Sequence, residues 1–232
     1  MRFVLALASL RRNRARTVLA VLGVAIAAAM LLDMVMLSTG MRESFRQLLL
    51  SRGFQMRLTP RGTLPFDTEA SIPCATGIVA TLRARPEVDL VSPVLGASLH
   101  VLRGDSAITT FALGVDPAAQ GDYQLATGAD ALAPNAIVAN DDFLRAAHAR
   151  VGDTLRIAAG YDPQLRTNSG ERALVVAGRA KFLYLAAGQL AIAIPLRTLQ
   201  QMTGVAREDR ASLFMVRLRN ANEVIPVSHW IR

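Results

Sequence analysis

The stretch that follows the first sixteen residues of the chain carries almost no charge. Between Arg16 and Arg42 the one charged side chain is Asp33, and Val18–Leu32 contains no polar side chain. At ~1.5 Å per residue, a helix over this stretch rises about 33 Å and matches the roughly 30 Å hydrocarbon core of a bilayer. In that core a single segment satisfies its backbone hydrogen bonds only as a helix. We therefore predict a transmembrane helix over residues 17–39.

Two other interpretations of this stretch are weaker. A cleavable signal peptide also joins arginines to an apolar run, but no small-x-small cleavage site follows Leu32, and the small residues 25–29 lie inside the run. A buried helix of a soluble domain would not have so long a charge-free stretch. An uncleaved membrane anchor is therefore the favoured interpretation.

The residues that precede the apolar run predict its orientation. Residues 1–16 contain five arginines and no acidic residue. Because positive charge beside a spanning segment is retained in the cytoplasm, we expect this basic segment to be cytoplasmic and the chain after about Gly40 to lie outside. Asp33 would then lie near the outer headgroups, where it either snorkels to the surface or hydrogen-bonds another transmembrane helix.

The outward part begins with an amphipathic pattern. Apolar residues at Met41, Phe45, Leu48 and Leu49 recur at helical spacing among charged ones, which predicts a stalk helix over residues 40–53 that ends at Gly53. The fold class expected for the whole chain is therefore a membrane-anchored α+β protein.

The remaining chain mixes short strands with short helices. Residues 54–115 and 211–232 are expected to form a split βαβ subdomain, and residues 116–210 an inserted β-rich subdomain. A split unit of this kind ends in a further strand, so we expect a C-terminally truncated domain. Alternation and turn signals predict strands at 54–59, 88–91, 98–103, 108–115, 136–139, 154–158, 173–177, 181–185, 190–194 and 212–218. The predicted helices are 78–85, 142–149, 196–203 and 221–232.

The sequence contains no recognisable catalytic constellation. It has no GxSxG, HExxH, CxxC, GxxxxGK[ST] or GxGxxG motif. One cysteine, Cys74, and three scattered histidines are too few soft ligands for a four-coordinate metal. We therefore expect no enzyme activity and no catalytic, cofactor-binding or metal-ligating residue. The carboxylates beside expected turns and helix starts are assigned to capping; they are Asp130, Asp141, Asp142 and Asp153, with Asp141 as the N-cap of the helix at 142–149.

The positive charge of the chain gives little support to nucleic-acid binding. The formal net charge is +8, but five of the positive charges precede the membrane segment. The remaining excess of positive charge is small and spread over the rest of the chain, which does not favour nucleic-acid binding. The bilayer is the expected partner of the N-terminal arginines.

Four stretches are similar to consecutive parts of one family, the MacB, LolC/LolE and FtsX class of ABC transporter permeases. The first is SLRRNRARTVLAVLGVAIAAAMLLDMVMLSTGMRESF, which resembles the first transmembrane helix of that class. The others resemble its periplasmic core domain; they are FALGVDP at 111–117, ANDDFLRAAHARVGDTLRI at 139–157 and LVVAGRAKF at 174–182.

The resemblance implies a permease subunit in the inner membrane, with its main domain in the periplasm and built of two subdomains. Its implied partners are a separate ABC ATPase, a second permease copy or homologue, and a periplasmic adaptor or lipoprotein. Three further transmembrane helices would follow the core domain. The implied mechanism is mechanical, because ATP hydrolysis in the cytoplasm would move the first helix and change the grip of the outer domain.

A different class of function also fits the residues. A single-pass anchored sensor or binding domain would need no ATPase and no further transmembrane helices. An outward-acting hydrolase is disfavoured by the missing motifs.

Overall fold

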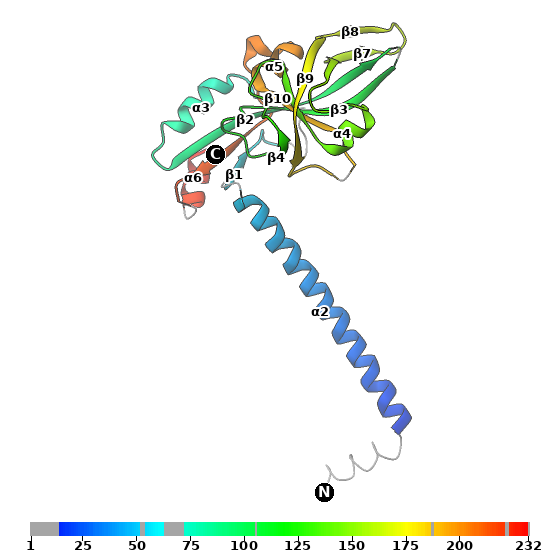
Figure 1. The fold of residues 1–232 in the computed structure, drawn as a ribbon. Coiled ribbons are helices and arrows are strands. Elements are labelled where there is room, and N and C mark those ends of the chain that lie inside the picture. The colour runs from blue at the N-terminus through cyan, green and yellow to red at the C-terminus, as the bar shows by residue number, and fades with distance from the viewer. Residues whose placement is uncertain are drawn as a thin grey trace. The chain divides into compact units, whose positions relative to one another are not determined.

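The computed structural model describes residues 14–51, 54–62, 72–104, 106–186, 188–220 and 223–231. The chain divides into two compact units, one that ends at Ser51 and one that begins at Arg52 (Figure 1). The basic segment expected in the cytoplasm lies outside the described residues, except for its last three positions, and so does Gly53, the expected end of the stalk.

The described residues of the first unit form one continuous helix. Helix α2 runs over Arg14–Ser51, a length of 38 residues. Within it Thr17–Gly40 is long and apolar enough to cross a membrane, and its side chains are exposed. The two helical segments expected at 17–39 and 40–53 are thus joined, because a single glycine at Gly40 costs a helix only about 1 kcal/mol. The boundary between a membrane part and a stalk stays a prediction.

The second unit contains the expected split βαβ arrangement. Strand β1 (Met56–Leu58) is followed by helix α3 (Ala75–Arg83) and strand β2 (Val88–Arg103). Strand β11 (Leu213–Leu218) lies between β1 and β2 and is antiparallel to both, so β1 and β2 are parallel. Helices α3 and α6 (Val224–Ile231) contribute buried residues to the same apolar cluster as these strands.

Strand β2 is one strand of 16 residues where the sequence predicted two. Its first half pairs with β11 up to Val94, and its second half pairs with β3 from Leu95 onward. Pro93 interrupts the sequence pattern, but it lies within the β11 pairing, opposite Phe214. The change of partner within one strand joins the split βαβ unit to the other strands.

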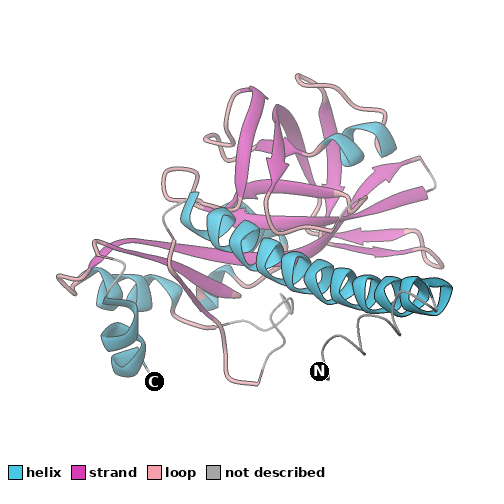
Figure 2. Cartoon of the chain, turned by 90° about the horizontal axis from the view of Figure 1, so that it is seen from below, coloured by secondary structure: helices cyan, strands magenta, loops and turns pink. Residues whose placement is uncertain are grey.

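Those other strands come from the middle of the chain. They are β3 (Ser106–Val115), β4 (Tyr123–Gly128), β5 (Ala136–Ala139), β6 (Thr154–Ala158), β9 (Arg172–Phe182) and β10 (Ala191–Pro195). The segments expected as separate strands at 173–177 and 181–185 are joined in β9, which ends at Phe182. Short helices lie at the periphery of the strands (Figure 2); they are α4 (Asp141–Ala146) and α5 (Leu196–Met202) in this part of the chain.

Six of the strands close into a ring. Strand β2 pairs with β3, β3 with β10, β10 with β5, β5 with β9, β9 with β6, and β6 again with β2. Side chains from all six strands meet in one buried cluster, among them Leu99, Ile137 and Ile192. Because every strand of the ring contributes, this cluster fills the inside, as in small closed barrels. Phe143 of α4 and Leu199 of α5 belong to the same cluster.

Three strands were not predicted from the sequence. Strand β4 pairs with β9 at the end of the sheet, and after Tyr123 its residues are exposed, so it lacks the alternation that indicates a half-buried strand. Strands β7 (Gly160–Asp162) and β8 (Thr167–Ser169) form a small hairpin between β6 and β9. Strands β6 and β9 themselves pair in an antiparallel manner.

The start of α3 is capped by a residue far away in the sequence. Cys74 stands at the N-cap position with φ 57° and makes no side-chain cap. Instead, Asp209 Oδ2 accepts a hydrogen bond from the Thr76 backbone N–H at 2.7 Å, and Gln200 Nε2 donates to Asp209 Oδ1 at 3.3 Å. Partial burial raises the pKa of Asp209, but the hydrogen bonds from Thr76 and Gln200 and the charge of Arg197 lower it below its usual value.

The N-cap of helix α4 lies one residue before the position predicted from the sequence. Asn140, and not Asp141, is the N-cap, since Asn140 Oδ1 accepts from Phe143 N at 2.9 Å. The same side chain accepts from Ala191 N at 3.1 Å and donates to Gln189 O at 2.7 Å. An amide carries both a donor and an acceptor, whereas the carboxylate of Asp141 could only accept. Asn140 therefore ties α4 to the start of β10.

Replacement of Asp209 by Asn is expected to destabilise the chain in a pH-dependent way. Because the pKa of this carboxyl is lower in the folded than in the unfolded chain, its contribution is fully present above about pH 4 and is lost as the pH falls through the folded pKa. We expect a loss of about 1 kcal/mol at pH 7, because the amide lacks the charge and replaces one of the two accepting oxygens by a donor. Thermal unfolding of D209N and wild type between pH 3 and 7 tests this. A stability difference between the two proteins that is equal at pH 3 and pH 7 would contradict the prediction.

The Asn140→Ala substitution is expected to lower the free energy of unfolding by about 2 kcal/mol, because it removes a cap and leaves partners in α4 and β10 unsatisfied. The matched control is Asp141→Ala, which removes an exposed carboxylate next to the cap and should cost less than about 0.5 kcal/mol. Chemical denaturation followed by circular dichroism measures both. A larger loss for Asp141→Ala than for Asn140→Ala would show that the cap is assigned wrongly.

Candidate functional site

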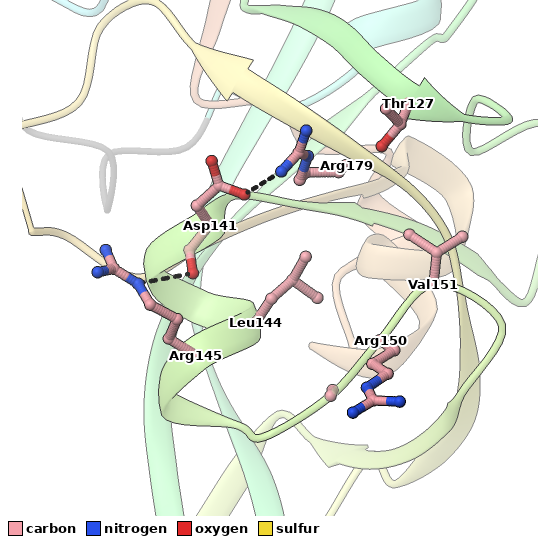
Figure 3. Close-up of a pocket in the computed structure, with 8 residues that line it drawn as sticks. Thr127, Asp141, Leu144, Arg145, Arg150, Val151 and Arg179 are labelled. Atoms are coloured by element: carbon pink, nitrogen blue, oxygen red, sulfur yellow. Dashed lines mark hydrogen bonds and ion pairs between the residues drawn. The ribbon is translucent and has the colours of Figure 1, made fainter.

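A recess in the second unit has a volume of about 670 Å³ and is open to solvent. It is lined by side chains from α4, from the loop after α4, and from β9 and β4 (Figure 3). We call it the arginine recess and define it by its lining residues, which are Thr127, Asp141, Leu144, Arg145, Ala149, Arg150, Val151 and Arg179.

Two of these residues are brought together by strand pairing. Thr127 of β4 lies directly opposite Arg179 of β9, next to a register shift between Leu125 and Thr127. Residues opposite each other on antiparallel strands present their side chains on the same face. Gly128 allows this close approach, since it has φ +86° and a Cβ there would lie 2.5 Å from the Ala177 carbonyl oxygen. Any other residue at this position would push β4 away from β9.

Helix α4 supplies one wall of the recess. Asp141, Leu144 and Arg145 are three and four residues apart, so they share one helix face. Arg179 Nη1 lies 3.2 Å from Asp141 Oδ1, and this ion pair links α4 to β9. Arg145 pairs with Asp142 within the helix. These pairs are exposed, so they contribute little to stability but hold the side chains in place.

The loop after α4 supplies the opposite wall. Its backbone is held because Arg150 N donates to Asp153 Oδ2 at 2.8 Å. The guanidinium of Arg150 has no hydrogen bond or ion pair with any residue that the structure describes. Leu144 and the 45% exposed Val151 lie between Arg150 and the Asp141–Arg179 pair (Figure 3). The recess thus has apolar side chains in the middle and arginines around them.

The lining combines cationic, apolar and hydroxyl side chains. The lining includes no nucleophile with a neighbouring base, and within the described ranges no three acidic, histidine or cysteine side chains gather as metal ligands. Three arginines against one aspartate favour an anionic group, because guanidinium ions bind carboxylates in a bidentate manner.

The histidines and the cysteine singled out in the sequence do not meet in the structure. His100 Nδ1 lies 3.2 Å from Thr109 Oγ1, and His148 follows α4 with φ 41°. His229 is on α6, and Cys74 is exposed at the start of α3. The structure does not bring these four side chains into one site.

The acidic residues assigned to capping have local partners. Asp130 accepts from the Tyr123 hydroxyl and from the Ala131 amide, and Asp153 accepts from the Arg150 amide. Asp142 pairs with Arg145, whereas Asp141 lines the recess. The arginines of the recess were not predicted from the sequence. The one local signal was the alternation of arginine with apolar residues in FLRAAHARV, and Arg179 lies far from it in the chain.

Comparisons with known proteins agree with this fold. Residues 17–232 match the family described as the MacB-like periplasmic core domain. The periplasmic region of MacB from Actinobacillus actinomycetemcomitans is similar at 14% identity and a TM-score of 0.52, covering 80% of this chain and 86% of that one. The extracellular domain of the noncanonic ABC-type transporter YknZ from Gram-positive bacteria is similar at 14% identity and a TM-score of 0.50, covering 73% and 84%.

At 14% identity these two structures support the fold alone. No curated protein matches the sequence. The family match extends over the apolar helix, the split βαβ unit and the ring of strands. The chain therefore belongs to the MacB-like periplasmic core domain family of ABC transporter permeases.

Proposed function

We propose that this chain is the N-terminal part of a permease subunit of a MacB-type ABC transporter. Helix α2 anchors it in the inner membrane with the N-terminal arginines in the cytoplasm, and residues 52–232 lie in the periplasm. A separate ATPase hydrolyses ATP in the cytoplasm, and the periplasmic part changes conformation in response. Family membership and the order of charge and apolar residues support this proposal.

The observation that carries the proposal is the continuity of α2. Its 38 residues include the stretch able to cross a membrane and continue beyond it without a break. A helix of this length extends about 57 Å, roughly twice the hydrocarbon core. Four residues then separate Ser51 from the start of β1 at Met56. A displacement of the cytoplasmic end can thus be transmitted outward through a single rigid element.

The proposed partners follow from this role. The chain acts with an ABC ATPase and a second permease subunit, identical or homologous, and it contacts a periplasmic adaptor or lipoprotein. The chain itself carries out no bond chemistry, in keeping with a recess built for binding. A MacB-type or Lol-type system exports or extracts its substrate, and the proposed role of the periplasmic part is to change its grip during the ATP cycle.

The proposed topology predicts how single cysteines react in intact cells. Cys74 is exposed and is the one cysteine of the sequence. We expect a membrane-impermeant maleimide to label it in intact spheroplasts. A variant with Cys74→Ser and Asn13→Cys should be labelled after permeabilisation alone. Labelling in the reverse pattern, or recovery of the chain in the soluble fraction, would overturn the proposed anchoring and orientation.

The proposed role also predicts an ATPase partner. We expect the chain, expressed from its natural locus with an affinity tag, to copurify from detergent-solubilised membranes with an ATP-hydrolysing subunit. Vanadate trapping of that complex should change the maleimide reactivity of Cys74, because the nucleotide state is coupled to the outer part. A membrane-inserted, folded chain without any associated ATPase would instead favour a single-pass sensor or binding domain.

A further inference from the structure

The arginines of the arginine recess differ in whether an acidic side chain already pairs with them. Arg179 pairs with Asp141, and Arg145 pairs with Asp142. The guanidinium of Arg150 has no such partner among the described residues. Asp153, three residues further on, accepts a hydrogen bond from the backbone amide of Arg150. Arg150 is therefore the cation with free donors for an incoming carboxylate.

The middle of the recess is apolar. Leu144 is partly buried against the inside of the ring, Ala149 is buried, and Val151 remains 45% exposed. Leu144 and Val151 lie beside the arginines in Figure 3. Exposed apolar side chains next to arginines are typical of the centre of protein interfaces, where arginine is enriched.

The shape of the recess indicates whether its ligand is a small molecule or part of a larger partner. Its volume of about 670 Å³ lies in the range of small-ligand pockets, which bury most of the ligand surface. The recess is open to solvent, so a small ligand would stay largely hydrated. A protein segment does not need enclosure, because its other contacts add to the binding free energy.

We propose that the arginine recess binds an acidic and apolar segment of a partner protein. A carboxylate of the segment binds Arg150, and a neighbouring apolar side chain packs on Leu144 and Val151. The inference goes beyond the proposed function, because it concerns binding to residues 52–232 and not ATP coupling. Its failure would leave the topology and the ATPase experiments untouched.

The test is a binding titration of the full chain in nanodiscs. The probe is a fluorescein-labelled peptide of repeated Gly-Glu-Leu units, followed by fluorescence anisotropy. We expect saturable binding that is weakened at least tenfold in the matched peptides Gly-Gln-Leu, which lacks the charge, and Gly-Glu-Ser, which lacks the apolar side chain. Binding should also weaken with added salt, because the contact is an exposed ion pair.

Two variants assign the binding to the recess. Arg150→Glu reverses the charge of an arginine without side-chain partners among the described residues, and Val151→Ser removes exposed apolar surface. Each should reduce the affinity at least tenfold and leave the thermal midpoint unchanged. The matched control is Arg207→Glu, which reverses an exposed arginine of the 3₁₀ helix Ala206–Glu208 outside the recess and should leave binding intact.

Three results would overturn the proposal. They are absence of saturable binding of the Gly-Glu-Leu peptide, equal binding of the Gly-Gln-Leu peptide, and equal loss in Arg150→Glu and Arg207→Glu. Binding of decanoate at the recess without binding of the peptide would assign the site to an anionic lipid and would also overturn it.

Discussion

Strand β2 hydrogen-bonds to three different strands along its 16 residues, and most of the described fold of residues 52–232 depends on these pairings. Its first half belongs to the split βαβ unit and its second half to the ring. The pairing of β6 with both β2 and β9 closes the ring around one apolar cluster. Closure removes free strand edges within the ring and gives α4 and α5 an apolar surface to pack against.

The position of the arginine recess follows from that closure. Phe143 buries one face of α4 in the ring, the partly buried Leu144 lies beside it, and Arg145 is exposed on the other side of the helix. Asn140 holds the start of α4 against β10, and the Asp141–Arg179 pair holds it against β9. A basic and apolar surface is thus supported by the closed ring of strands, and functional side chains are commonly positioned by a scaffold of this kind.

Most strands with strong apolar patterns were predicted from the sequence, and those with weak patterns were not. Strands β5 and β10 are confirmed, because their residues are buried and bounded by turn signals. Strand β4 was missed, since its stability comes from pairing with β9 and not from its own apolar residues. The recess was missed for a related reason. Its residues come from 127, 141–151 and 179, and their meeting depends on the register of β4 with β9.

Local sequence patterns were enough to predict the long apolar helix, the mixed α+β character of the rest and the split βαβ order. These depend on local hydropathy, backbone hydrogen bonding and turn residues, which act between neighbours in the chain. The tertiary structure alone decided the closure of the ring, the cap of α3 by Asp209 and the gathering of three arginines around apolar side chains. Each of these joins residues far apart in the chain, and such contacts form only when the register of the strands is set by packing of the common core.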